Sequence, residues 1–148
     1  MEILESVKKY FLEKRIEKYL KTTKDDIEFI ISLYAVIVYL DREIKQIEVI
    51  NSFCLLDSYI RLKFRKLDPE RVEDIKTFAK NLFYKKIKNF KTHDSSFELE
   101  KQEILSTLRK IKNKKLYKNI LVIINADNIV TDKENQFIVE MLKIYNEE

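Results

Sequence analysis

The chain has 148 residues, of which 45% are hydrophobic and 36% are charged, and its formal net charge is +4. It contains no glycine and a single proline, so the glycine-dependent tight turns of β-rich folds are not available to it. Length and composition therefore predict one soluble all-α domain, residues 1–148, with a substantial hydrophobic core.

Two helices are predicted in the N-terminal part of the chain. Apolar residues recur at helical spacing along one face of the first: Val7, Phe11, Leu12 and Ile16. The second, at about 24–40, follows an acidic variant of the capping box formed by Thr23 and Asp26. Because this second helix is apolar almost all round, we expect it in the middle of a bundle.

A third helix is predicted at about 45–66 and a fourth from Pro69 to about Phe90. Asp68 stands at the cap position before Pro69, a typical helix start. The only cysteine, Cys54, lies in an apolar stretch, which predicts a buried structural thiol. An intrachain disulfide cannot form, which fits a reducing compartment.

The polar segment 91–96 is the clearest predicted loop. Ser95 and Glu98 form a capping-box pattern at its end, and this predicts the start of a fifth helix that reaches Ile111.

A sixth helix is predicted at 116–126, and the last opens at another capping box, formed by Thr131 and Glu134. Seven helices with short connections predict a single compact bundle.

An internal repeat links the two halves of the chain. Its matched positions, each 86 residues apart, are Asp41 with Asp127, Ile44 with Val130, and Glu48 with Glu134. Each acid-bearing junction lies between an apolar helix and a following helix. The repeat therefore predicts a pseudo-symmetric pair of helical hairpins inside one domain.

Apolar and acidic residues around the second junction form a wider pattern: Ile104, Leu105, Leu108, Ile111, the run 120–126, Asp127, Val130, Glu134, Ile138 and Leu142, with an earlier copy at 34–56. Over about 26–145 this pattern resembles the tellurite-resistance TerB-like family. The resemblance implies an all-helical bundle of about seven helices, cytoplasmic or at the inner membrane face, with a role in stress or phage defence. It also implies that acids near the two junctions hold a metal ion.

The chain departs from that family where the family has glycine after each aspartate, because Arg42 and Asn128 stand there instead. Asparagine adopts a left-handed conformation at modest cost, whereas arginine tolerates it less well. Arg42 also puts a cation beside Asp41, which argues against a metal site at the first junction.

The candidate metal ligands are the acids of the two junctions: Asp41, Glu48, Asp127, Asp132 and Glu134. A hard divalent cation such as calcium takes six to eight oxygen ligands, and carboxylates are suited to it. The stretch 127–134 lacks the length and the central glycine of an EF-hand loop. Capping of the helix starts explains the same acids without a metal, and both interpretations stand.

Basic residues supply a competing hypothesis. Residues 80–118 carry twelve Lys or Arg against four Asp or Glu, a net charge of +8. The candidate phosphate contacts of a nucleic-acid-binding subunit are Lys85, Lys86, Lys88, Lys91, Lys110, Lys112, Lys114 and Lys115. They would bind nucleic acid if they met on one surface, and otherwise form a solvated face.

No catalytic constellation is recognisable. The only histidine, His93, lies in the polar loop, and no glycine-rich phosphate loop exists, so we expect no enzyme. The longest apolar stretch, 29–40, is shorter than the roughly 20 residues of a membrane span, and no secretory signal is visible. The sequence favours a cytoplasmic, non-enzymatic interaction module for protein partners, with a divalent cation as candidate cofactor and peripheral membrane contact left open.

Overall fold

The computed structural model describes residues 7, 24–111, 113–126 and 129–146. These residues form six helices: α2 (Lys24–Val38), α3 (Gln46–Lys63), α4 (Pro69–Thr92), α5 (Asp94–Ile111), α6 (Lys114–Ile124) and α7 (Asp132–Asn146). The all-α prediction is confirmed. The described count is six rather than about seven, because the predicted first helix lies outside the described residues apart from Val7. No helix in the described ranges combines the length and apolar character needed to cross a membrane.

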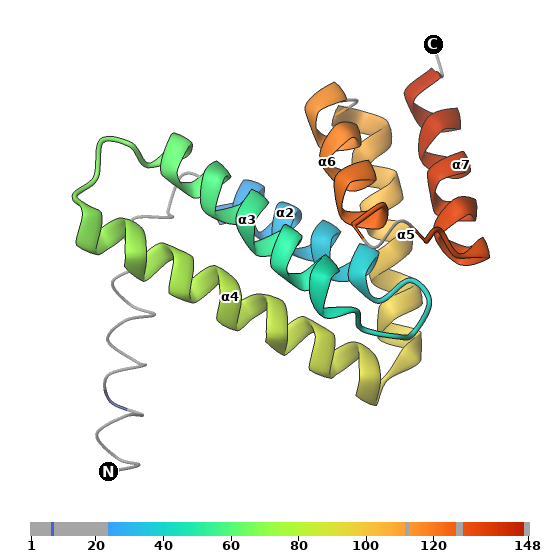
Figure 1. The fold of residues 1–148 in the computed structure, drawn as a ribbon, viewed down its shortest axis with the longest axis horizontal. Coiled ribbons are helices and arrows are strands. Elements are labelled where there is room, and N and C mark those ends of the chain that lie inside the picture. Colours follow the sequence, from blue (N-terminus) through green and yellow to red (C-terminus); the bar gives the residue numbers. More distant parts are fainter. Residues whose placement is uncertain (1–6, 8–23, 112, 127–128, 147–148) are drawn as a thin grey trace.

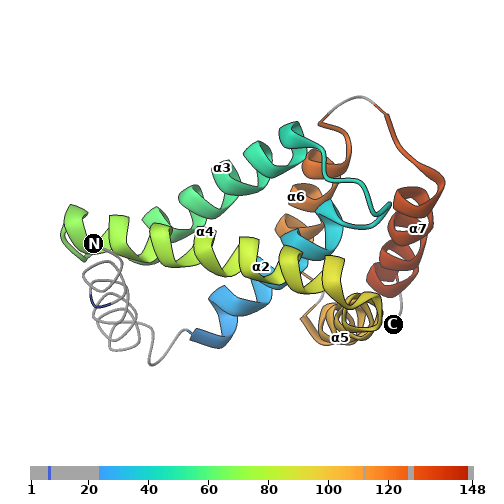
Figure 2. The same cartoon turned by 90° about the horizontal axis from the view of Figure 1, so that it is seen from below.

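α2 forms the centre of the bundle. It packs against α3, α4, α5 and α6, and every side chain from Ile30 to Leu40 is buried. The long α4 runs below α2 and α3, and α5 leaves from its C-terminal end, where α6 and α7 also stand (Figures 1 and 2). A helix that is apolar on all sides needs neighbours on all sides, so the central position predicted for it is confirmed.

An aromatic cluster fixes the corner between α4 and α5 against the end of α2. The rings of Phe90 and Phe97 meet edge to face with centroids 5.4 Å apart, and Tyr39 meets Phe97 at 5.2 Å. Phe90 and Phe97 are fully buried. Edge-to-face aromatic pairs contribute stability beyond the area they bury. The cluster therefore places the first turn of α5 beside the α2–α3 junction.

This corner explains why the predicted loop at 91–96 is wrong. α4 continues to Thr92 and α5 begins at Asp94, which leaves only His93 between them. The predicted capping box of Ser95 and Glu98 is also wrong, because both residues lie inside α5. Burial of the aromatic side chains on both sides extends the helices through a segment whose polar composition predicts a loop.

Two other expectations have opposite outcomes. Asp68 caps α4 as predicted, with its Oδ1 accepting a hydrogen bond from Arg71 N at 3.0 Å. Cys54 is exposed rather than buried. α3 turns Val49, Ser52 and Leu56 inward, and Cys54 lies on the opposite side of the helix. The prediction of a buried thiol was therefore wrong, because an apolar neighbourhood in sequence does not fix the inward face.

The helix ends repeat at one spacing. α2 ends at Val38 and α6 at Ile124, while α3 begins at Gln46 and α7 at Asp132, so each pair is 86 residues apart. This spacing equals the one that relates the acids of the two junctions in the sequence. The junctions 39–45 and 125–131 consequently have the same length.

Candidate functional site

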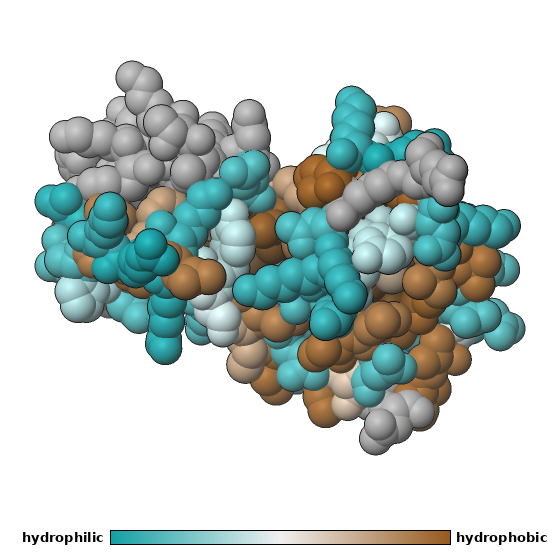
Figure 3. All heavy atoms as spheres, turned by 90° about the horizontal axis from the view of Figure 1, so that it is seen from above, coloured by the Kyte–Doolittle hydropathy of each residue, from teal (hydrophilic) through white to brown (hydrophobic). Residues whose placement is uncertain are grey.

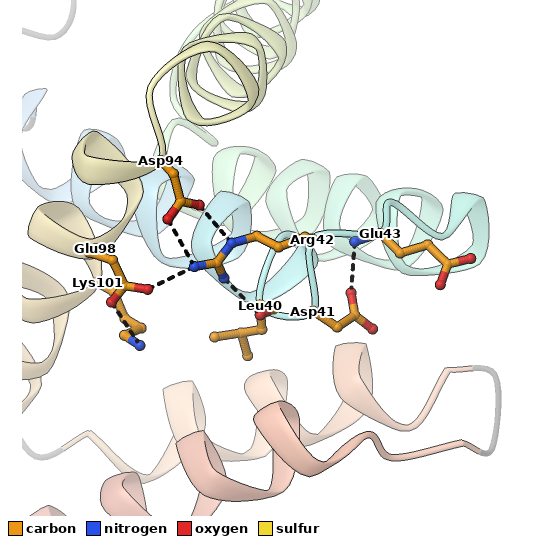
Figure 4. Close-up of polar contacts among 7 residues, drawn as sticks. All are labelled: Leu40, Asp41, Arg42, Glu43, Asp94, Glu98 and Lys101. Carbon is orange, nitrogen blue, oxygen red and sulfur yellow. Dashed lines mark hydrogen bonds and ion pairs between the residues drawn. The ribbon is translucent and has the colours of Figure 1, made fainter.

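The junction between α2 and α3 turns at Arg42. Its φ is 64°, which is the left-handed region, and its backbone N–H donates to Tyr39 O at 3.0 Å. Asp41 Oδ1 accepts a hydrogen bond from Glu43 N at 3.1 Å, which closes a local turn (Figure 4). The left-handed conformation costs a non-glycine residue about 1–2 kcal/mol. Arg42 thus adopts the strained conformation at the position where the TerB-like pattern has glycine.

The Arg42 side chain is anchored on α5. Its Nε donates to Asp94 Oδ1 at 2.7 Å and its Nη2 to Glu98 Oε1 at 2.8 Å, while Nη1 donates to Leu40 O at 3.1 Å. The guanidinium carbon lies 4.3 Å from the centre of the Phe97 ring. Figure 4 shows the side chain extending away from Asp41. The expectation that Arg42 places its charge beside Asp41 was therefore wrong.

The cation beside Asp41 is Lys45. Its Nζ lies 3.6 Å from Asp41 Oδ2, 4.0 Å from Glu48 Oε2 and 3.9 Å from Glu134 Oε1. Glu48 and Glu134 are each only 1% exposed. Burial of a carboxylate is costly unless an opposite charge lies close by. We call these four residues the Lys45 cluster; it joins the α2–α3 junction to the start of α7.

Glu134 also caps its own helix. Its Oε1 accepts from Thr131 N at 3.0 Å, and Thr131 Oγ1 accepts from Glu134 N at 3.2 Å, so the predicted capping box is confirmed. Glu48 is the third residue of α3, as Glu134 is of α7. The residue equivalent to Thr131 is Lys45, which makes no side-chain cap on α3. Where the second junction has a hydroxyl cap, the first has an ammonium directed to the buried acids.

The predicted metal ligands are only partly brought together. Asp41, Glu48 and Glu134 approach one point, but the Lys45 ammonium lies among them. Asp132 is exposed at the start of α7, and Asp127 lies outside the described residues. Among the residues that the structure describes, no group of three or more His, Cys, Asp or Glu side chains is placed to hold a metal ion. Among the described residues, the positive charge that lies between these three carboxylates is therefore the Lys45 ammonium.

Sequence reasoning missed Lys45, although a signal for it exists. Lys45 lies within the repeated segment, at the offset that pairs it with Thr131. A lysine at a position that caps the other copy of a repeat is unusual, because it offers no acceptor for the first N–H groups of a helix. A charge at such a position, close in sequence to two acids, indicates an internal ion pair.

The predicted phosphate-binding lysines that the structure describes fall into two groups, toward opposite ends of α5. Lys85, Lys88 and Lys91 are exposed near the C-terminal end of α4, where α5 begins. Lys110, Lys114 and Lys115 lie at the other end of α5, which has 18 residues and is therefore about 27 Å long. Lys86 is bonded to Glu100 Oε1 at 2.7 Å. Lys112 lies outside the described residues.

The interaction between Arg42 and Glu98 should make the free energy of unfolding depend on pH. Partial burial raises the pKa of Glu98, but hydrogen bonds from Arg42 and Lys101 outweigh it and hold the pKa below its ordinary value of 4.5. The folded state thus binds fewer protons than the unfolded state near that pH. The stabilisation that ionised Glu98 gives the folded state is therefore present above pH 4.5 and is lost as the pH falls through the lowered pKa. Because the side chain is 48% exposed, we expect less than about 1 kcal/mol.

Urea unfolding of Glu98→Gln across this pH range measures that contribution. The difference from the unsubstituted protein should be present at neutral pH and shrink in acid. Glu103→Gln, at an exposed position on the same helix, is the control. A difference that stays constant down to the acid limit would contradict the pKa shift of Glu98.

Comparisons of the chain with protein-family models, with curated proteins and with solved structures gave no match. The TerB-like resemblance therefore rests on the sequence pattern alone.

Proposed function

We propose that the protein is a non-enzymatic helical interaction module, organised as two related helical hairpins in the manner of TerB-like stress and defence proteins. The common spacing at the two junctions supports the duplicated arrangement, since the end of α2 and the start of α3 match the end of α6 and the start of α7 at an offset of 86 residues. Glu48 and Glu134 occupy equivalent positions in the two hairpins and both approach Lys45.

In this proposal Lys45 supplies the positive charge that a divalent cation would bring to the junction acids. A lysine ammonium is a compact point charge on a flexible stem, so it reaches a buried cluster from the edge. It links Asp41 and Glu48 of the first hairpin to Glu134 of the second. In this proposal the ion pairs of Lys45 hold the two hairpins together in place of a metal ion. The role of the Lys45 cluster is to support a binding surface structurally.

The observation that carries the interaction function is the exposed apolar surface next to and along α7. Ile129 is 62% exposed, Val130 42%, Val139 43% and Leu142 45%. α7 turns other residues, such as Phe137 and Met141, toward the core, so Val139 and Leu142 form a second apolar face. Figure 3 shows apolar side chains gathered on the end of the molecule that α6 and α7 form. Exposed apolar patches of this kind are typical of protein-binding surfaces.

This function is tested by affinity capture, with the full chain as bait in cells of the organism that encodes it. The double variant Val139→Ser/Leu142→Ser should lose at least one protein that the unsubstituted chain retains. Ile47→Ser/Ile50→Ser is the matched control, because these two residues of α3 are also exposed, at 45% and 52%. Binding should then be repeated with the purified pair.

All four side chains lie on the surface, so each variant should unfold within about 0.5 kcal/mol of the unsubstituted protein. Identical sets of captured proteins from the α7 variant and the control would contradict a docking role for α7.

The alternative, a nucleic-acid-binding subunit, has less support. A continuous groove or stripe of cations is the usual footprint of such a protein. Here the lysines are divided between the two ends of α5.

A further inference from the structure

A pocket of about 500 Å³ lies between α2, α3 and the beginning of α6, and none of its lining residues belongs to the Lys45 cluster. Its walls are mainly apolar: Phe29, Ile30, Leu55, Leu62, Ile111 and Leu116. Figure 3 shows the molecule from above, relative to Figure 1. In this view the surface is hollowed between the part formed by α2 and α3 and the end formed by α6, and apolar side chains lie in the hollow. Volume and lining match those of small-molecule sites, which are apolar with a few polar groups.

One polar pair in the pocket, Tyr34 and Asn119, includes a hydroxyl donor for which the described residues provide no acceptor. Asn119 Nδ2 donates to the hydroxyl oxygen of Tyr34 at 3.2 Å, and both residues line the pocket. Tyr34 is only 1% exposed, and its own hydroxyl proton has no acceptor within the described ranges. Burial raises the pKa of Tyr34, so the hydroxyl keeps its proton. A buried donor without an acceptor is costly, and a ligand oxygen would satisfy it.

The basic residue in the pocket lining is Lys115, on the same helix as Asn119. Lys115 lies four residues before Asn119 and thus on the same helix face, and it is exposed at the pocket. In the described part of the chain no carboxylate pairs with Lys115. The pocket's one acid, Asp26, is instead bonded to Lys63 at 3.0 Å. Asp26 lies eight residues before Tyr34 on α2, about 12 Å along the helix.

We propose that this pocket binds an amphipathic monocarboxylate, that is, an apolar body with one carboxylate, as in a medium-chain fatty acid. The carboxylate accepts a hydrogen bond from the Tyr34 hydroxyl and pairs with the Lys115 ammonium. The apolar body lies against Phe29, Leu55 and Leu116. A single donor beside a single cation matches one carboxylate, and the far end of the pocket offers no second cation, because Asp26 there is paired with Lys63.

Calorimetric titration of the full chain with decanoate, decanol and decyltrimethylammonium tests the head group. Decanoate should bind most tightly and the ammonium compound most weakly. Lys115→Gln and Tyr34→Phe should each weaken decanoate about tenfold, the loss expected for a charge-assisted hydrogen bond. Decanol binding should not depend on Lys115. The controls are Lys114→Gln and Tyr84→Phe, which change exposed residues outside the pocket lining and should leave decanoate affinity unchanged.

A blocking variant distinguishes the pocket from general surface adsorption. Ser58 is exposed and lines the pocket, so Ser58→Trp should fill it without disturbing the core and should abolish decanoate binding. Ser106→Trp, at an exposed position on α5, should not. Equal binding of decanoate by both tryptophan variants, equal affinity for decanoate and decanol, or no binding of decanoate would each overturn the proposal.

Discussion

Replacing Lys45 with glutamine should lower the free energy of unfolding by about 3 kcal/mol, the usual cost of removing one partner from a buried charge cluster. Glu48 and Glu134 are almost fully buried, and the variant removes an ammonium that lies within 4.0 Å of both. Urea denaturation at neutral pH measures the loss. Lys63→Gln is the matched control, because its partner Asp26 is exposed and the pair should contribute less than about 1 kcal/mol.

The same variant should acquire a response to calcium. Without the ammonium, three carboxylates face one another, and a divalent cation relieves their repulsion. Calcium at one hundred times its dissociation constant would then stabilise the variant by about 2.7 kcal/mol. The unsubstituted protein should show no calcium-dependent change in Tm. A calcium-dependent rise in the Tm of the unsubstituted protein would show that Lys45 does not exclude the metal.

Replacing Arg42 should separate the energy of its contacts from the strain of its backbone. Arg42→Ala keeps the left-handed φ but loses the hydrogen bonds to Asp94, Glu98 and Leu40, and we expect a loss of about 2 kcal/mol. Arg42→Gly loses the same contacts but relaxes the backbone. After the flexibility of glycine in the unfolded chain is allowed for, it should be about 1 kcal/mol more stable than Arg42→Ala.

Urea denaturation of the two variants side by side measures that difference. Equal stability of the glycine and alanine variants would mean that the positive φ at Arg42 is not a source of strain.

The parts of the fold that local patterns control are those that the sequence predicted. α2 is apolar on all sides and is central, and the Asp68 and Thr131 caps form at the helix starts where their residue types indicate them. The connection between α4 and α5 was mispredicted because its outcome depends on tertiary contacts. Packing of Phe90 on Phe97 outweighs the loop-favouring residues between them.

The acids of the site were also predicted from the repeat, but their role was not. Acids at a common offset indicate that the two junctions are equivalent. The offset does not indicate which cation neutralises the charge of these acids. That depends on the Lys45 side chain, whose direction follows from packing at the α3 start. The pocket could be predicted even less, since Tyr34, Leu55 and Asn119 come from three different helices and share no sequence pattern.

The central claim is that the Lys45 ammonium couples the two hairpins through Glu134. A double-mutant cycle with Lys45→Gln, Glu134→Gln and the combined variant, followed by urea denaturation, measures this coupling directly. The structure predicts a favourable coupling of at least about 1 kcal/mol, because the pair is nearly buried and its charged atoms lie 3.9 Å apart. A coupling of zero, with the two single losses simply adding, would contradict the claim.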